Sequence, residues 1–203
     1  MAPITKLSSN ILGFEPNWAG GVELDYAFST VVSQARLKSE QRKALTARPL
    51  RVQRCEFLLQ EGEYAQLLNW MRYYGSAYML VPIYVEPIVS TDTVDLQGLS
   101  IINTENTQYF KNLHAYQGGA VIVDVRNTTK VEQLDVNVVS NTSITLSTPI
   151  AGSFPGGSSN VYSIMRAYIN ERDFRHLSEG LTVASVTFQE ILNEDPIVGI
   201  GAS

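Results

Sequence analysis

Hydrophobic and polar residues alternate with a period of two along much of this chain, and the alternation predicts antiparallel β-strands. In residues 22–32, Val22, Leu24, Tyr26 and Phe28 occupy every second position between polar residues or alanine, as in a strand with one buried face. Turn-forming residues separate such stretches. Related patterns predict further strands over residues 50–60, 77–86, 94–99, 119–125, 131–139, 143–146, 160–165, 166–169 and 181–192.

The clearest helical pattern covers residues 61–75. Its apolar and aromatic residues recur at positions i, i+3, i+4, i+7 and i+10, which places them on one helix face. Two acids near the start suit the positive end of the helix dipole, and Gly75 suits the C-terminus. The residues of the predicted face are Tyr64, Leu67, Leu68, Met71 and Tyr74.

The order of these elements predicts a mainly β protein with one prominent helix, an α+β fold built of β-sandwich or barrel-like modules. Short, evenly spaced strands between residues 88 and 165 are typical of a small barrel or sandwich. We therefore expect residues 88–165 to be inserted into a first module made of residues 1–87 and 166–203. Residues 33–49 lack a period and are expected to form a long loop or short helix, and residues 1–18 an extended arm.

The composition is that of a globular protein. The chain has 203 residues, of which 44% are hydrophobic and 17% charged, and this length can bury a proper core. One cysteine and two histidines offer no disulfide framework and few ligands for a transition metal. Apolar runs are far shorter than the roughly 20 residues of a membrane span. We expect a soluble protein, made in the cytoplasm, with no cofactor and no membrane insertion.

Sequence motifs for catalysis are missing. The chain has no nucleotide-binding glycine fingerprint, no P-loop and no GxSxG motif, so the common phosphate-binding and serine-nucleophile sites are not indicated. A hydrolase using Asp124, Glu132 or Asp135 is an alternative, although no spacing brings two of these carboxylates together. We expect a protein without enzymatic activity.

The charge is unevenly distributed along the chain. Residues 1–75 hold nine Lys or Arg and seven Asp or Glu, whereas residues 76–203 hold six and thirteen. Residues 36–54 alone hold seven basic residues and one acid, Glu40. This segment can be a solvated loop, a nucleic-acid surface, or a clamp that pairs its arginines with carboxylates of a neighbouring protein. The interaction candidates are Trp18, Arg36, Glu40, Arg42, Arg48, Arg51 and Arg54.

Aromatic residues suggest a second class of function. Trp70 and Tyr73 lie three residues apart on a flank of the predicted helix, and Tyr116 lies in the inserted region. Exposed aromatic rings of this kind can stack on a sugar, which makes a carbohydrate-binding module an alternative. Rings at such positions more often fill an interface or cover a sheet edge.

Several segments together resemble tail proteins of long-tailed bacteriophages, of the distal tail or tail-hub-like family. The resemblance rests on Phe28-Ser29-Thr30, on Ser39–Leu45 with its Glu-Gln-Arg element, on Arg48-Pro49-Leu50-Arg51, and on the helix 64–75 followed by Leu80–Tyr84. Weaker matches are the strand at residues 118–123, the strand at 143–146 and the turn at 154–157. Trp18 before the first strand also fits.

This resemblance implies a virion structural protein of the tail or baseplate. Such a subunit forms a ring with copies of itself, hexameric or of related symmetry, and joins the tail tube to distal tail components by protein–protein contacts. It brings no catalytic residues and no direct reading of nucleic acid. A neck or tail-terminator ring is the alternative position within the virion. In this interpretation the five arginine candidates between residues 36 and 54 supply interface charge, Glu40 orders their segment, and Trp18 with the arm contacts a neighbour.

Overall fold

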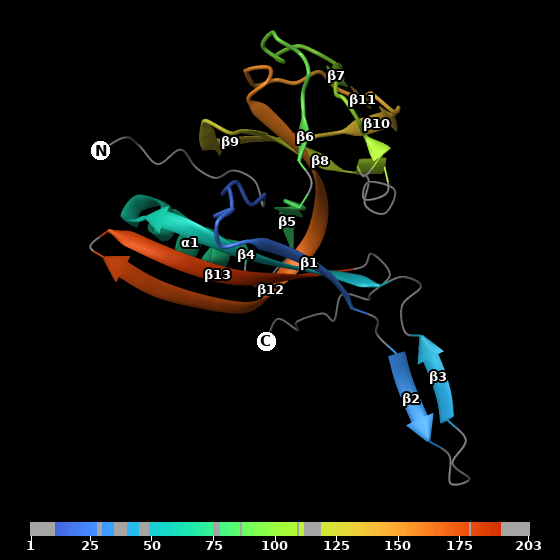
Figure 1. The fold of residues 1–203 in the computed structure, drawn as a ribbon, viewed down its shortest axis with the longest axis vertical. Helices are drawn as coiled ribbons and strands as arrows, with labels where there is room; N and C mark the ends of the chain where they lie inside the picture. Colours follow the sequence, from blue (N-terminus) through green and yellow to red (C-terminus); the bar gives the residue numbers. More distant parts are fainter. Residues whose placement is uncertain are drawn as a thin grey trace, which may run out of the picture.

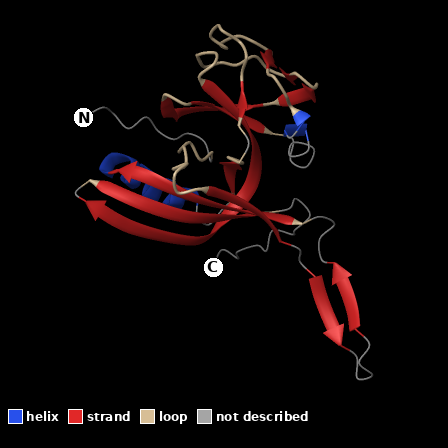
Figure 2. Ribbon diagram, in the orientation of Figure 1, coloured by secondary structure: helices blue, strands red, loops and turns tan. Residues whose placement is uncertain are grey.

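The structure is a computed structural model, mainly β with antiparallel sheets and one fourteen-residue helix. Figure 1 and Figure 2 show the strands wrapping around the helix on one side and forming a smaller β unit on the other. The predicted α+β, mainly β fold class with sandwich-like sheets is confirmed. The structure describes residues 11–27, 30–34, 40–44, 49–74, 78–85, 87–108, 110–111, 119–178 and 180–191.

An eight-stranded antiparallel sheet organises the molecule. Its order is β1-β4-β13-β12-β8-β9, and β5 and β6 pair with β12 outside this path. Most of these strands follow the predicted alternation, because a half-buried strand buries every second side chain. The bounds are β1 (Val22–Ala27), β4 (Leu50–Gln60), β5 (Met79–Pro82), β6 (Ile88–Val89), β8 (Ala120–Asp124), β9 (Asn127–Leu134), β12 (Ser159–Ser178) and β13 (Leu181–Glu190).

The twenty-residue strand β12 connects the two halves of the fold. Its first residues pair with β6 and β8, its middle pairs with β5, and its remainder pairs with β13. A register shift between Ile169 and Glu171 marks an irregularity where β12 runs along β13. The sequence predicts strands 160–165 and 166–169 followed by a loop at Asn170–Asp173; that loop is wrong, since the strand continues to Ser178.

Two smaller sheets complete the architecture. One has the order β10-β11-β7, from β10 (Val136–Val139), β11 (Ser143–Leu146) and β7 (Ile101–Asn103). The other is the hairpin of β2 (Thr30–Gln34) and β3 (Glu40–Ala44), which Figure 1 shows standing away from the body. The predicted loop or helix at residues 33–49 is therefore wrong in its described part. The strand predicted at 94–99 is also wrong, because only Asp95 forms a bridge there.

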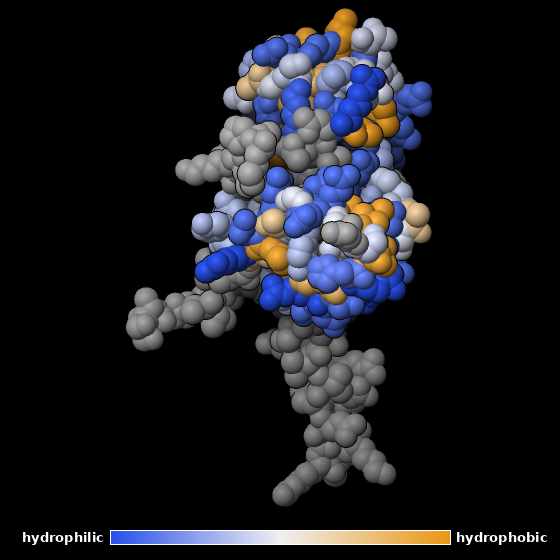
Figure 3. Space-filling model, turned by 90° about the vertical axis from the view of Figure 1, so that its left-hand side faces the viewer, coloured by the Kyte–Doolittle hydropathy of each residue, from blue (hydrophilic) through white to orange (hydrophobic). Residues whose placement is uncertain are grey.

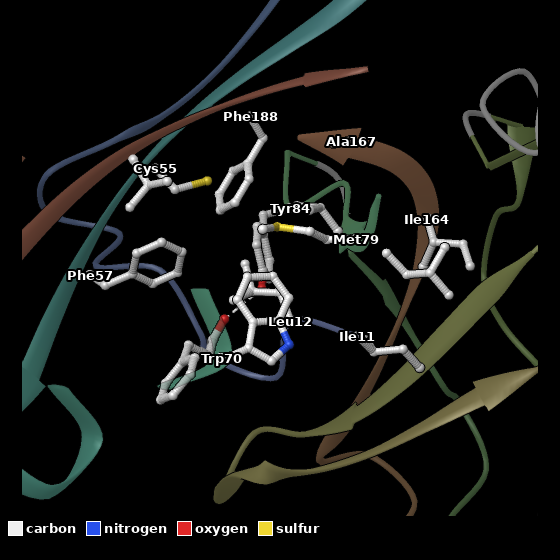
Figure 4. Packing of buried hydrophobic residues seen from close by; sticks show 14 of the residues in the cluster. Ile11, Leu12, Cys55, Phe57, Trp70, Met79, Tyr84, Ile164, Ala167 and Phe188 are labelled. Carbon is white, nitrogen blue, oxygen red and sulfur yellow. Dashed lines mark hydrogen bonds between the residues drawn. The ribbon is translucent and has the colours of Figure 1, made fainter. Parts of the chain in front are cut away.

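Helix α1 (Glu61–Tyr74) is confirmed, and it covers the inner face of β4 and β13. Leu67, Trp70 and Met71 are its buried residues, and they share a cluster with Phe57 and Phe188 (Figure 4). Tyr64, Leu68 and Tyr74 of the predicted face are only partly buried. The buried side of the helix therefore includes Trp70, which the predicted face did not contain. Packing against the sheet, and not the polarity of the side chains alone, decides which residues of the helix are buried.

The segment before β1 packs into the chain's own core. Ile11 forms a parallel bridge with Leu80, and the Leu12 amide donates to the Leu80 carbonyl at 2.9 Å. The buried Tyr84 hydroxyl donates to the Phe14 carbonyl at 2.5 Å. Figure 4 shows Ile11 and Leu12 pointing into the same cluster as Tyr84. The expectation of an arm held by a neighbour is wrong for residues 11–16; residues 1–10 lie outside the described part.

The core consists of two hydrophobic clusters, and strands of the large sheet contribute side chains to both. One lies between α1, β4, β5, β12 and β13; the other lies wholly within residues 88–161. Strand β8 contributes to both, with Val121 and Val123 in the first cluster and Ala120 and Ile122 in the second. A strand buried on both faces reads as a continuous apolar run, as residues 120–123 do. The predicted division at residues 88 and 165 stays a prediction, because residues of the insert help to build both clusters.

Candidate functional site

The face of β1, β4, β13 and β12 that points away from α1 is the candidate functional site, and we call it the open face. Register alignment places Glu23, Arg54, Thr187 and Glu171 in one row across the four strands. These residues lie on the open face because their chain neighbours, such as Cys55 and Val186, point into the core. Among the described elements, no helix or strand covers this side of the four strands (Figure 1).

A second row beside the first carries more acid. Glu56, Ser185 and Asp173 are paired across β4, β13 and β12. Leu58 follows on β4 and is 47% exposed. The open face therefore combines carboxylates with an exposed apolar side chain, which differs from the purely polar outer face of an ordinary solvated sheet.

Arg54 forms ion pairs at the edge of the open face. Its Nη1 lies 2.8 Å from Asp25 Oδ2 and 3.3 Å from Glu23 Oε2. All three side chains are more than half exposed, so each pair contributes at most about 1 kcal/mol to stability. These ion pairs direct the Arg54 side chain toward β1 and away from the carboxylates on β12.

The open face contains a hollow of about 450 Å³. Its lining includes Glu23, Glu56, Glu171 and Asp173, with Arg54 and Arg172 as the basic residues. The loop before β1 bounds it.

That loop is tied to β4 through Glu56. The Asn17 amide group donates to Glu56 Oε1 at 3.0 Å, and the Asn17 backbone N–H donates to the Glu56 carbonyl. Gly20 lies so close to the Glu56 carboxylate that a Cβ there would clash with it. A larger residue at this position would require the Glu56 side chain to move.

Arg51, predicted as an interface residue, is buried inside the sheet. Its guanidinium forms an ion pair with Glu190, with Nη2 and Oε1 2.6 Å apart and Nε 3.1 Å from both carboxylate oxygens. The Arg51 backbone N–H also donates to Glu190 Oε2. Arg51 is 1% exposed, so it offers no surface to a partner. Side chains of β4 alternate between its two faces, and this alternation puts Arg51 on the inner face together with Cys55 and Phe57.

The remaining predicted residues are scattered. Trp18 is 46% exposed and its indole N–H donates to Glu15 at 3.0 Å, so it keeps a surface that a partner can contact. Glu40 and Arg42 lie on β3, and the described structure does not include their side chains. Arg36 and Arg48 lie outside the described residues. Of the predicted residues whose side chains the structure describes, Arg54 alone lies on the open face.

The carboxylates of this site were missed in the sequence. Glu171 and Asp173 fall in the stretch interpreted as a loop between strands, where no pattern assigns a face. Glu190 was missed as well, although the alternation Val186, Phe188, Glu190 places an acid at an inward position. Arg51 is a basic residue at an inward position of another strand. Together, these two inward charges could have predicted the buried ion pair.

Two of the three enzymatic candidates are engaged in structural contacts, and the third, Asp135, is exposed. Asp124 accepts from the backbone N–H of Arg126 at 3.0 Å, and Glu132 accepts from the N–H groups of Ala151 and Gly152. Burial raises the pKa of the Cys55 thiol to about 12, so it stays protonated at neutral pH and is a poor nucleophile. Within the described residues no group of three or more His, Cys, Asp or Glu is arranged to hold a metal ion.

The two aromatic candidates that the structure describes, Trp70 and Tyr73, do not form a stacking platform. Trp70 is 2% exposed inside the first cluster, whereas Tyr73, on the neighbouring part of the helix surface, is 77% exposed. Tyr116 lies outside the described residues. Figure 3, a view of one side of the molecule, shows a mainly hydrophilic surface with separate hydrophobic patches.

No protein-family model matches this sequence, and no curated protein matches it significantly. Among the described helices, none has the length and apolar character needed to cross a membrane.

Proposed function

We propose that this chain is a non-enzymatic structural subunit of a bacteriophage tail or baseplate. It would assemble with copies of itself into a ring and join the tail tube to distal tail components. The resemblance of residues 18–190 to tail proteins supports the proposal, and a neck or tail-terminator ring would use the same kind of contacts. The protein would be made in the host cytoplasm and would function in the virion.

The observation that carries this proposal is the β2–β3 hairpin standing away from the body. A two-stranded hairpin alone is at best marginally stable in water, and its free backbone edges favour pairing with another chain. A neighbouring protein would supply the missing contacts. The open face, with exposed Leu58 beside carboxylates, offers a second surface for association.

The test is the mass of the purified protein by light scattering after size exclusion, over about 1 to 100 μM, since self-association follows mass action. We expect a discrete oligomer or a mass that rises with concentration, and a ring in electron micrographs of the assembled fraction. A mass that stays monomeric over the whole series would contradict self-assembly.

A further inference from the structure

We propose that the open face of one copy, at Glu56, Glu171 and Asp173, receives the basic β2–β3 hairpin of a second copy. This inference rests on the proposed self-assembly and names the two surfaces that meet. The contact is head to tail, because the two surfaces belong to different parts of the same chain.

The first step is the excess of negative charge on the open face. Glu171 and Asp173 are two positions apart on β12 and share a face, which separates their Cα atoms by about 7 Å. Glu56 lies two strands from Asp173 in the same row, a distance of about 10 Å. All three carboxylates line the same hollow, so each adds to a negative potential there.

The second step is that Arg54, the basic residue in the same row as Glu171, is already occupied by other carboxylates. Arg54 is drawn toward β1 by its ion pairs with Glu23 and Asp25. Within the described part of the chain, no ion pair is found for Glu171 or Asp173. These carboxylates are exposed and can accept a cation from outside, which fits an arginine or lysine side chain of a partner.

The third step identifies the partner by its charge. Residues 30–48 hold five basic residues and one acid, Glu40. The strands β2 and β3 within this segment stand away from the body (Figure 1), so these two strands can reach a second copy. A basic hairpin and an acidic hollow on one chain are complementary between copies. The basic residues are Arg36, Lys38, Arg42, Lys43 and Arg48.

The geometry has a consequence for symmetry. A contact between two different surfaces leaves one hairpin and one open face unused in a dimer, so each added copy can bind the next one. Such heterologous contacts close into a ring when the rotation between copies permits. Two copies in a closed, symmetric dimer are not expected from a single contact of this kind.

The experiment reverses the charge of each surface separately. Glu171→Lys with Asp173→Lys alters the open face, and Arg42→Glu with Lys43→Glu alters the hairpin. Each double variant should raise the concentration needed for half-assembly about tenfold or more at low salt, because like charges would then meet. An equimolar mixture of the two variants should assemble again, since each altered surface finds a complementary one. Sedimentation velocity at about 50 and 500 mM salt measures both effects and their screening.

A matched control for the open-face variant carries the same change of net charge at a distant place. Glu105→Lys with Asp135→Lys alters two exposed acids of the smaller β unit and should assemble like the wild type. If the wild type assembles and the face or hairpin variants assemble equally well, this inference is overturned while self-assembly stands. The same holds if the mixture fails to recover. A wild type that never leaves the monomer overturns self-assembly and this contact together.

Discussion

At the scale of the residue, the ion pair between Arg51 and Glu190 is the most demanding contact in the sheet. Both side chains are almost fully buried, 2% and 0% exposed, so both charges have lost their hydration. The attraction between them and the hydrogen bond from the Arg51 backbone N–H offset part of this loss, while Arg51 Nη1 is buried without a hydrogen-bond partner. Removal of one partner would leave the other charge buried without its counterpart.

We predict that Arg51→Met lowers the free energy of unfolding by about 3–5 kcal/mol. Adding Glu190→Gln to this variant should recover part of the loss, since the buried negative charge is then removed as well. Urea denaturation of the purified variants measures both values. Arg54→Met is the matched control, and its exposed ion pairs predict a loss of no more than about 1 kcal/mol. Equal losses for the two arginine variants would show that the buried pair has no special role.

At the scale of the element, α1 is held to the sheet by one stripe of side chains. Leu67 is fully buried against the first cluster, whereas Asn69, two positions later, is exposed. Most of the stability of a helix in a protein comes from the burial of such a stripe and not from helix propensity. Truncation of Leu67 to alanine therefore removes buried packing, whereas truncation of Asn69 removes an exposed side chain.

We predict that Leu67→Ala lowers the free energy of unfolding by about 2–5 kcal/mol, through lost burial and the cavity left behind. Asn69→Ala should change it by no more than about 0.5 kcal/mol, since this side chain contributes little to the packing. Thermal and urea unfolding followed by circular dichroism compare the two. A similar loss in both variants would contradict the packing described for α1.

At the scale of the whole molecule, the two hydrophobic clusters depend on one another. Strands β8 and β12 present residues to both, for example Val161 to the second cluster and Tyr162 to the first. Loss of either cluster would expose one face of the shared strands to water. We therefore expect both halves to unfold in one cooperative transition.

The prediction is that Ile144→Ala, in the second cluster, shifts the unfolding of the first cluster by about 2–5 kcal/mol. Trp70 reports on the first cluster once the other tryptophan is removed by Trp18→Phe. Its fluorescence and the far-ultraviolet circular dichroism should follow one transition in urea. Two separate transitions, with Trp70 indifferent to Ile144→Ala, would instead establish residues 88–165 as an independent module.

The local patterns of the sequence were sufficient for most elements. Period-two alternation located β4 and β11 at their observed bounds, and the helical period located α1. The Pro155-Gly156-Gly157 turn was also predicted, and Gly157 adopts a φ of 70° there. Side chains and backbone within a few residues specify these features, so a single sequence contains the information.

What the sequence determined by itself was the mainly β class, the one prominent helix and the strongly basic character of residues 36–54. Tertiary structure alone decided which charged residues meet. It buried Arg51 against Glu190, 139 positions away, and brought Glu56 and Asp173 into one row. It also made β12 continuous, because pairing with β13 gives its polar second half a partner that local polarity does not reveal. Pairing between distant strands depends on register across the whole sheet, and no local pattern records it.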